Sequence, residues 1–72
     1  MKALKITTEY ITLGQLLKIE NIIQSGGEAK IFLSTNIVLV NGELENRRGR
    51  KLYPQDKIKI NKQEFIIEWL KK

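Results

Sequence analysis

Cysteine and histidine are both absent from this chain of 72 residues. Their absence rules out disulfides, a thiolate nucleophile and an imidazole general base, and it removes the usual zinc ligands. The eight carboxylates form no cluster along the sequence of the kind that binds a metal, so we expect neither a metal nor a cofactor. A chain of this length buries only about 60% of its unfolded surface, and its stability must come from that burial alone.

Long apolar runs are also missing. The first six residues alternate between charged and apolar side chains, whereas a signal peptide needs an unbroken apolar run of about 7–15 residues. No stretch approaches the roughly 20 apolar residues of a membrane span. Neither of the common glycine-rich phosphate-binding motifs occurs. We therefore expect a cytoplasmic protein with no membrane partner and no small-molecule substrate, and we do not expect an enzyme.

One pair of carboxylates has the spacing of an acid–base pair. Glu43 and Glu45 are two residues apart, which places them on one face of a predicted strand. Catalytic carboxylates of this kind lie in a cleft that shifts their pKa values, whereas these two lie beside a run of arginines. Ion pairing with the arginines is therefore the interpretation that we favour.

The positive charge is concentrated in one place. The chain has 13 basic and 8 acidic residues, a net charge of +5. Four of the basic residues lie between positions 47 and 51, and the rest of the chain is close to neutral. We call residues 47–51, which include Arg47, Arg48, Arg50 and Lys51, the basic segment. A focused patch indicates a polyanionic partner, although a solvated loop without a partner has the same composition.

The first half of the chain predicts a strand and two helices. Residues 2–7 alternate as a strand does. Thr12 and Gln15 have the spacing of a capping box, and Leu13, Leu16 and Leu17 form an apolar stripe, so we predict a helix over residues 13–23. Ser25 and Glu28 form a second capping box. The second helix follows to about residue 35, with a stripe of Ala29, Phe32 and Leu33, and only one or two residues join the helices.

The second half predicts strands. Residues 37–40 are rich in β-branched side chains, and Asn41-Gly42 is the signature of a type I′ hairpin turn. Pro54 indicates a turn over residues 53–56, which is followed by strands over residues 57–60 and 64–70. We predict a single α+β domain over residues 1–72, in which two short helices pack on one face of a small, mostly antiparallel sheet.

Gly26 and Gly27, before the second helix, have two interpretations that are compatible. They form a tight turn that lets the helices approach, or they let a phosphate reach the free N–H groups of the helix start, with Lys30 one turn further on. Four aromatic side chains are assigned to structure: Phe32 and Phe65 to the core, and Tyr10 and Trp69 to covering the sheet. Tyr53 lies near the basic segment, where a structural role is favoured over stacking on a base. Because no exposed aromatic residues alternate with the charges, recognition of phosphates and of RNA shape is favoured over base reading.

Residues 11–60 resemble the S-four-type RNA-binding domain, named after the small-subunit ribosomal protein S-four (S4). The shared pattern is two short helices, a strand that ends in Val40-Asn41-Gly42, a basic segment, and Asp56 shortly before the next strand. The stretches 25–30 and 41–51 are most similar to the stand-alone bacterial members, the YaaA and YbcJ type. The resemblance implies an αL-type RNA-binding motif, and a core motif over about residues 11–60.

The resemblance also implies which residues contact RNA. By position these are Lys18, Ser25, Gly26, Gly27, Lys30, Arg47, Arg48, Arg50 and Lys51. Many members have an arginine where this chain has Gly26, and an arginine and an aspartate where this chain has Thr12 to Gly14. Two expected phosphate contacts are therefore missing, which lowers the affinity or leaves more of it to the basic segment.

We therefore predict a monomeric, non-enzymatic protein that binds structured RNA through phosphates, with ribosomal RNA or a ribosome assembly intermediate as the implied target. The alternative is an adaptor that docks the basic segment on an acidic protein partner. We also expect that replacing Arg47 and Arg50 together with Glu abolishes RNA binding and leaves thermal stability almost unchanged, because exposed surface substitutions have small effects.

Overall fold

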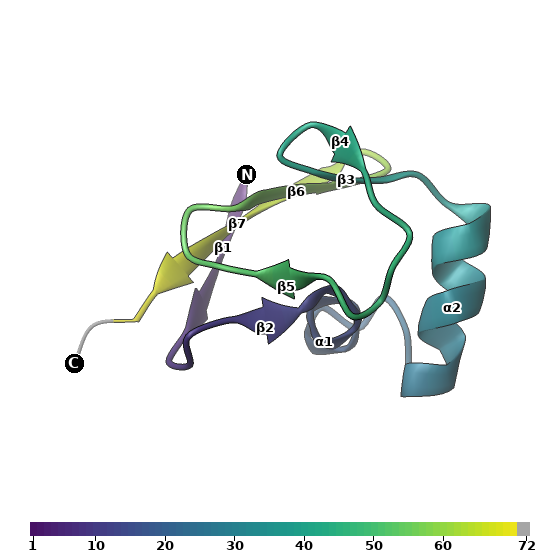
Figure 1. Ribbon diagram of the computed structural model, residues 1–72, viewed down its shortest axis with the longest axis horizontal. Coiled ribbons are helices and arrows are strands. Elements are labelled where there is room, and N and C mark those ends of the chain that lie inside the picture. The colour runs from purple at the N-terminus through teal and green to yellow at the C-terminus, as the bar shows by residue number, and fades with distance from the viewer. Residues whose placement is uncertain (71–72) are drawn as a thin grey trace.

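The computed structural model describes residues 1–70. Within these residues, nine elements follow one another (Figure 1). They are β1 (Lys2–Ile6), β2 (Ile11–Thr12), α1 (Leu13–Ile19), α2 (Gly26–Thr35), β3 (Val38–Val40), β4 (Glu43–Leu44), β5 (Lys51–Leu52), β6 (Lys57–Ile60) and β7 (Gln63–Trp69).

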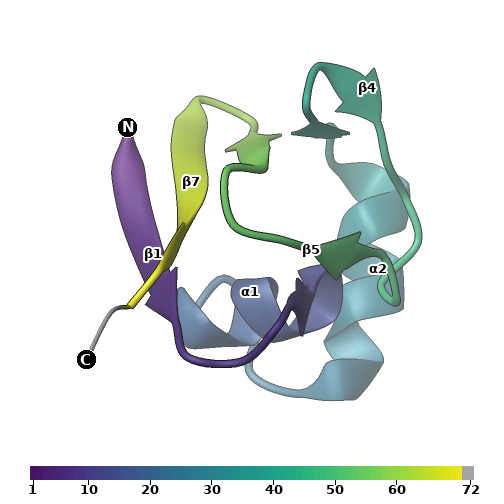
Figure 2. The same ribbon diagram turned by 60° about the vertical axis from the view of Figure 1, so that its left-hand side comes forward.

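The strands form a five-stranded sheet and a separate two-stranded ribbon. The order in the sheet is β1-β7-β6-β3-β4, and every neighbouring pair is antiparallel except β1 and β7, which run parallel. The ribbon pairs β2 with β5. Both helices lie on one side of the five-stranded sheet (Figures 1 and 2). The predicted α+β architecture, with two short helices on a mostly antiparallel sheet, is confirmed.

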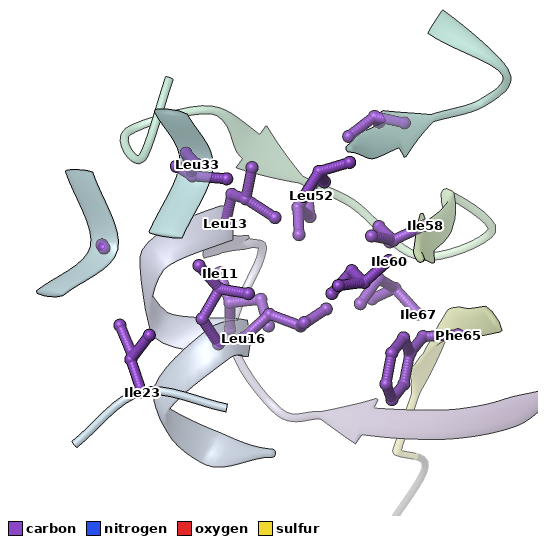
Figure 3. Packing of buried hydrophobic residues seen from close by; sticks show 14 of the residues in the cluster. Ile11, Leu13, Leu16, Ile23, Leu33, Leu52, Ile58, Ile60, Phe65 and Ile67 are labelled. Atoms are coloured by element: carbon purple, nitrogen blue, oxygen red, sulfur yellow. The ribbon is translucent and has the colours of Figure 1, made fainter. Parts of the chain in front are cut away.

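The core lies between the helices and the sheet. The α1 stripe of Leu13, Leu16 and Leu17 is fully buried, as predicted. Figure 3 shows side chains of α1 and α2 on one side of the core and those of β6 and β7 on the other. The sheet contributes mainly Val38, Val40, Ile58, Ile60, Phe65 and Ile67. The assignment of Phe32 to the core needs correction, because Phe32 is only partly buried against it. Trp69 is half exposed at the end of β7.

Helix α1 begins as predicted and ends earlier. The Thr12 hydroxyl accepts from the Gln15 N–H at 3.2 Å, and the Gln15 side chain accepts from the Thr12 N–H at 2.8 Å. At the other end, Asn21 takes a left-handed conformation with φ of 59°. Its N–H donates to the Lys18 carbonyl, and the next N–H donates to the Leu17 carbonyl, which is the Schellman pattern that closes a helix.

The predicted end at residue 23 is therefore wrong. Residues 20–25, six residues in all, join the two helices instead of the one or two expected. Helix α2 then starts at Gly26, with the Glu28 carboxylate accepting from the N–H groups of Gln24 and Ser25. Its buried stripe consists of Ala29 and Leu33.

The hairpin after β3 is tied to the turn before β6. Asn41 and Gly42 have φ of 52° and 86°, as a type I′ turn requires. The Asn41 side chain donates to Asp56 Oδ1 at 3.0 Å and accepts from the Lys57 N–H at 2.9 Å. The other carboxylate oxygen of Asp56 accepts from the Tyr53 N–H at 2.8 Å. Two residues that carry the family resemblance, Asn41 and Asp56, thus have a structural role in this fold.

Candidate RNA interface

The basic segment lies across the start of α1. The first N–H groups of α1, those of Leu13 and Gly14, donate to the carbonyls of Arg50 and Arg48, each at 2.9 Å. Lys51 continues into the β2–β5 ribbon, where it pairs with Thr12. A Cβ atom on Gly14 would lie 3.4 Å from the Arg48 carbonyl oxygen. The missing side chain of Gly14 therefore gives the segment room to approach, and the backbone of the segment is held in place.

Glu45 organises the arginines of the basic segment. Only 6% of Glu45 is exposed, and its carboxylate accepts from Arg47 Nε at 2.9 Å, Arg47 Nη2 at 3.2 Å and Arg50 Nη1 at 2.7 Å. The Arg47 backbone N–H adds a further bond at 3.1 Å. The hydrogen bond from the Arg47 side chain is the largest cause that lowers the Glu45 pKa to about 2. The carboxylate is therefore ionised at neutral pH.

The preference for ion pairing over catalysis is confirmed for Glu45 and wrong for Glu43. Among residues 1–70, Glu43 is exposed and forms no ion pair. The assumption that Arg47 and Arg50 are free surface residues is also wrong. Both bind the covered carboxylate, and the Arg50 side chain is only 31% exposed. Replacing both with Glu would place three carboxylates together, so that variant would lose stability as well as charge.

A hollow of about 280 Å³ is lined by residues of the basic segment and of both helices. We call it the first hollow. It brings together three of the predicted contact residues, Lys18 from α1, Gly26 from α2 and Arg48. Arg48 reaches across and donates to the Gly26 carbonyl at 3.3 Å. The remaining residues that line the first hollow are Thr12, Gly14, Gln15, Ala29 and Gly49.

A second hollow, of about 510 Å³, is lined mainly by the basic segment. Gly49 lines both hollows. The second hollow contains the three remaining predicted cations of the segment, Arg47, Arg50 and Lys51, together with the ring of Tyr53. The two hollows thus share Gly49 and together include all four cations of the basic segment.

Comparison with known proteins identifies the family of the chain. A family model described as "S4 domain" matches residues 4–68. The chain belongs to the S4-domain family. It is also 61% identical over 57 residues to a protein of Bacillus subtilis (strain 168) named "Probable ribosome maturation protein RlbA", and the match covers 79% of this chain and 80% of that protein. Membership of this family places the chain among RNA-binding proteins, as the resemblance implied.

The other predicted RNA contacts of this S4 domain do not line either hollow. These contacts are Ser25, Gly27 and Lys30. All three are exposed near the start of α2. A Cβ atom on Gly26 or Gly27 would meet nothing within 4 Å, so the tight-turn interpretation of these glycines is wrong. Within residues 1–70, the N–H groups of both glycines have no protein acceptor. The Glu28 carboxylate lies at the same helix end, and its charge opposes an incoming phosphate there.

Sequence reasoning missed two residues of this surface. Gly14 was noted only as a departure from the family pattern, although a glycine in the first turn of a helix is a signal of a close backbone approach. Tyr10 was assigned to the sheet, but its ring lies against Tyr53 and under the Lys51 ammonium. Over the described part of the chain, no helix is long and apolar enough to cross a membrane, and no three potential ligands gather as a metal site requires.

Proposed function

We propose that this S4 domain binds structured RNA in ribosome maturation, with ribosomal RNA or an assembling ribosomal particle as its target. The similar protein of Bacillus subtilis is named as a ribosome maturation protein, and 61% identity over most of both chains supports a shared role. The proposed role is binding without catalysis by a monomer in the bacterial cytoplasm.

One observation carries this proposal, which is the meeting of Lys18, Arg48 and the start of α2 around the first hollow. Within residues 1–70, Lys18, Arg48 and Lys51 form no ion pair, so their charges are free for phosphates. Arginine binds phosphate with two parallel hydrogen bonds, whereas lysine acts as a point charge. We propose that phosphates of one RNA strand follow the basic segment from the first hollow to the second.

The helix start is the weaker part of the proposed surface. The free N–H groups of Gly26 and Gly27 and the charge of Lys30 favour a phosphate, and Ser25 lies beside them. Glu28 acts against them, as described above. We therefore assign most of the affinity to the basic segment and Lys18.

Paired charge removal tests the proposal. The double variant Lys18→Gln, Arg48→Gln should lower RNA affinity about 10- to 100-fold and reduce the slope of log K against log salt by about 2, because two phosphate contacts are lost. The matched control is Lys57→Gln, Lys59→Gln, which removes the same charge from exposed positions of β6. Equal losses in both variants would leave only a general charge effect and contradict the proposed site.

The type of partner is tested by competition. A folded RNA with a helical stem should displace a labelled ribosomal RNA fragment better than poly-U or duplex DNA at the same salt concentration. With about four engaged cations, the salt slope for the wild-type chain should be near −3. A slope near zero, together with tight capture of an acidic protein, would favour the adaptor role instead.

A further inference from the structure

The second hollow contains an aromatic ring as well as cations. Tyr53 lines it beside Arg47, Arg50 and Lys51, and 43% of Tyr53 is exposed. Phosphate binding alone requires only charge and N–H groups. An exposed ring beside three cations at the same hollow is the combination that binds a nucleobase together with its phosphates.

Contacts with neighbouring residues hold Tyr53 in place. Its centroid lies 5.7 Å from that of Tyr10, with the ring planes inclined at 50°. The Lys51 ammonium lies 5.0 Å from the Tyr10 centroid. The Tyr53 backbone N–H donates to Asp56, which is also bound by Asn41. A ring fixed by these contacts loses little conformational freedom when a ligand stacks on it.

We propose that the second hollow binds an unpaired nucleotide of the RNA, with its base stacked on Tyr53 and its neighbouring phosphates on Arg47 and Lys51. This inference rests on the proposed function and narrows it, because the bases of a perfect duplex are already stacked inside the helix. The preferred ligand is then an RNA stem interrupted by a bulged nucleotide. The stem phosphates lie along the first hollow, and the unpaired base enters the second.

The experiment uses two RNAs and three forms of the full chain. One RNA is a fully paired hairpin stem, and the other is the same stem with one unpaired adenosine. The wild-type chain should bind the interrupted stem at least about fivefold more tightly. Tyr53→Leu should bind both RNAs equally, because it lowers the affinity for the interrupted stem more than the affinity for the paired stem. Tyr53→Phe, which retains the ring, should keep the preference.

A second readout reports stacking directly in the wild-type chain. With 2-aminopurine in place of the unpaired adenosine, stacking on Tyr53 should quench its emission on binding, and Tyr53→Leu should remove that quenching. Melting curves of the variants show whether each is folded, and if Tyr53→Leu fails to fold, the wild-type quenching and Tyr53→Phe decide the question.

Each outcome has a different meaning. Equal affinity of the wild-type chain for both stems, or a preference that persists in folded Tyr53→Leu, would overturn the stacking site while leaving phosphate binding intact. Loss of the preference in Tyr53→Phe would assign it to the hydroxyl group and also overturn stacking. Failure of the wild-type chain to bind either RNA would overturn this inference and the proposed function together.

Discussion

The basic segment and the start of α2 were both predicted to contact RNA, yet they are built differently. The basic segment is fixed by backbone hydrogen bonds to α1 and by the bonds of Arg47 and Arg50 to Glu45. The start of α2 is exposed, and a Cβ on either of its two glycines would meet nothing within 4 Å. Within residues 1–70, a single hydrogen bond, from Arg48 to the Gly26 carbonyl, links it to the segment. One region has a preformed surface, whereas the other offers open N–H groups.

The difference shows that the number of cations in a segment does not measure its free charge. Residues 45–51 contain four basic residues and one acid, a net charge of +3. Glu45 thus reduces the charge of the segment, but its bonds hold two arginine side chains at fixed positions. Preorganisation lowers the entropic cost of binding, so an acid can favour the binding of a polyanion.

Among single substitutions, the largest expected effect on stability comes from removing that acid. Glu45→Ala raises the net charge of the chain by one, yet it should lower RNA affinity about tenfold and the free energy of unfolding by about 1–3 kcal/mol, because the arginines lose their acceptor. Glu43→Ala is the matched control, since it makes the same charge change at an exposed neighbour. Denaturant unfolding and RNA titration measure both. Higher affinity in folded Glu45→Ala would refute the organising role.

A comparison of two arginines should give the next largest effect. Arg50→Gln should lower the free energy of unfolding by about 1–2 kcal/mol and also weaken RNA binding, because Arg50 bonds to the covered Glu45. Arg48→Gln removes the same charge from an arginine that forms no ion pair within residues 1–70. It should change the free energy of unfolding by less than about 0.5 kcal/mol while weakening RNA binding. Urea titrations and RNA titrations distinguish the two. Identical stabilities would show that the Glu45–Arg50 bond contributes nothing.

Acid should remove the contribution of Glu45 selectively. Its pKa is about 2 in the folded chain and near 4.5 when unfolded, so it stabilises the fold fully above about pH 4.5, and this stabilisation is lost as the pH falls toward 2. The difference in unfolding free energy between the wild-type chain and Glu45→Ala should therefore shrink over that interval. Thermal melts from pH 7 to pH 3 measure it, and a constant difference would contradict the assignment.

The smallest effect is expected at the start of α2. A Cβ on Gly27 meets nothing, so Gly27→Ala should raise the free energy of unfolding by up to about 1 kcal/mol through the unfolded state. If a phosphate approaches this backbone closely, the same variant should weaken RNA binding a few-fold. Unchanged RNA affinity in the stabilised variant would exclude Gly27 from the interface and leave recognition to the basic segment.

The parts of the fold that depend on local signals were predictable from the sequence. Both helix starts follow from capping pairs, Thr12 with Gln15 and Ser25 with Glu28, and the hairpin follows from Asn41-Gly42. The end of α1 was not predicted, because it depends on the left-handed backbone of Asn21, which asparagine adopts in many settings besides helix ends.

The candidate site was predictable in its charge and in the pairing of Glu45 with arginines, and not in the rest of its organisation. The cluster of cations over residues 47–51 is plain in the sequence. Three features depend on the tertiary structure. They are the burial of the Glu45 side chain, the approach of the Arg48 backbone to Gly14, and the contact of Tyr10 with Tyr53. The burial of a carboxylate depends on its neighbours in three dimensions, and amino-acid composition carries no signal for it.

The parallel pairing of β1 with β7 has a consequence for the order of events in folding. Lys2 pairs with Phe65, whereas the β3–β4 hairpin joins Val40 to Glu43. Closing the larger loop requires a greater loss of chain entropy, and such non-local pairings slow folding. During synthesis, β1 emerges before all other strands described here and must wait for β7, which emerges after them. We therefore expect β1 to lack its strand partner until translation has passed residue 69.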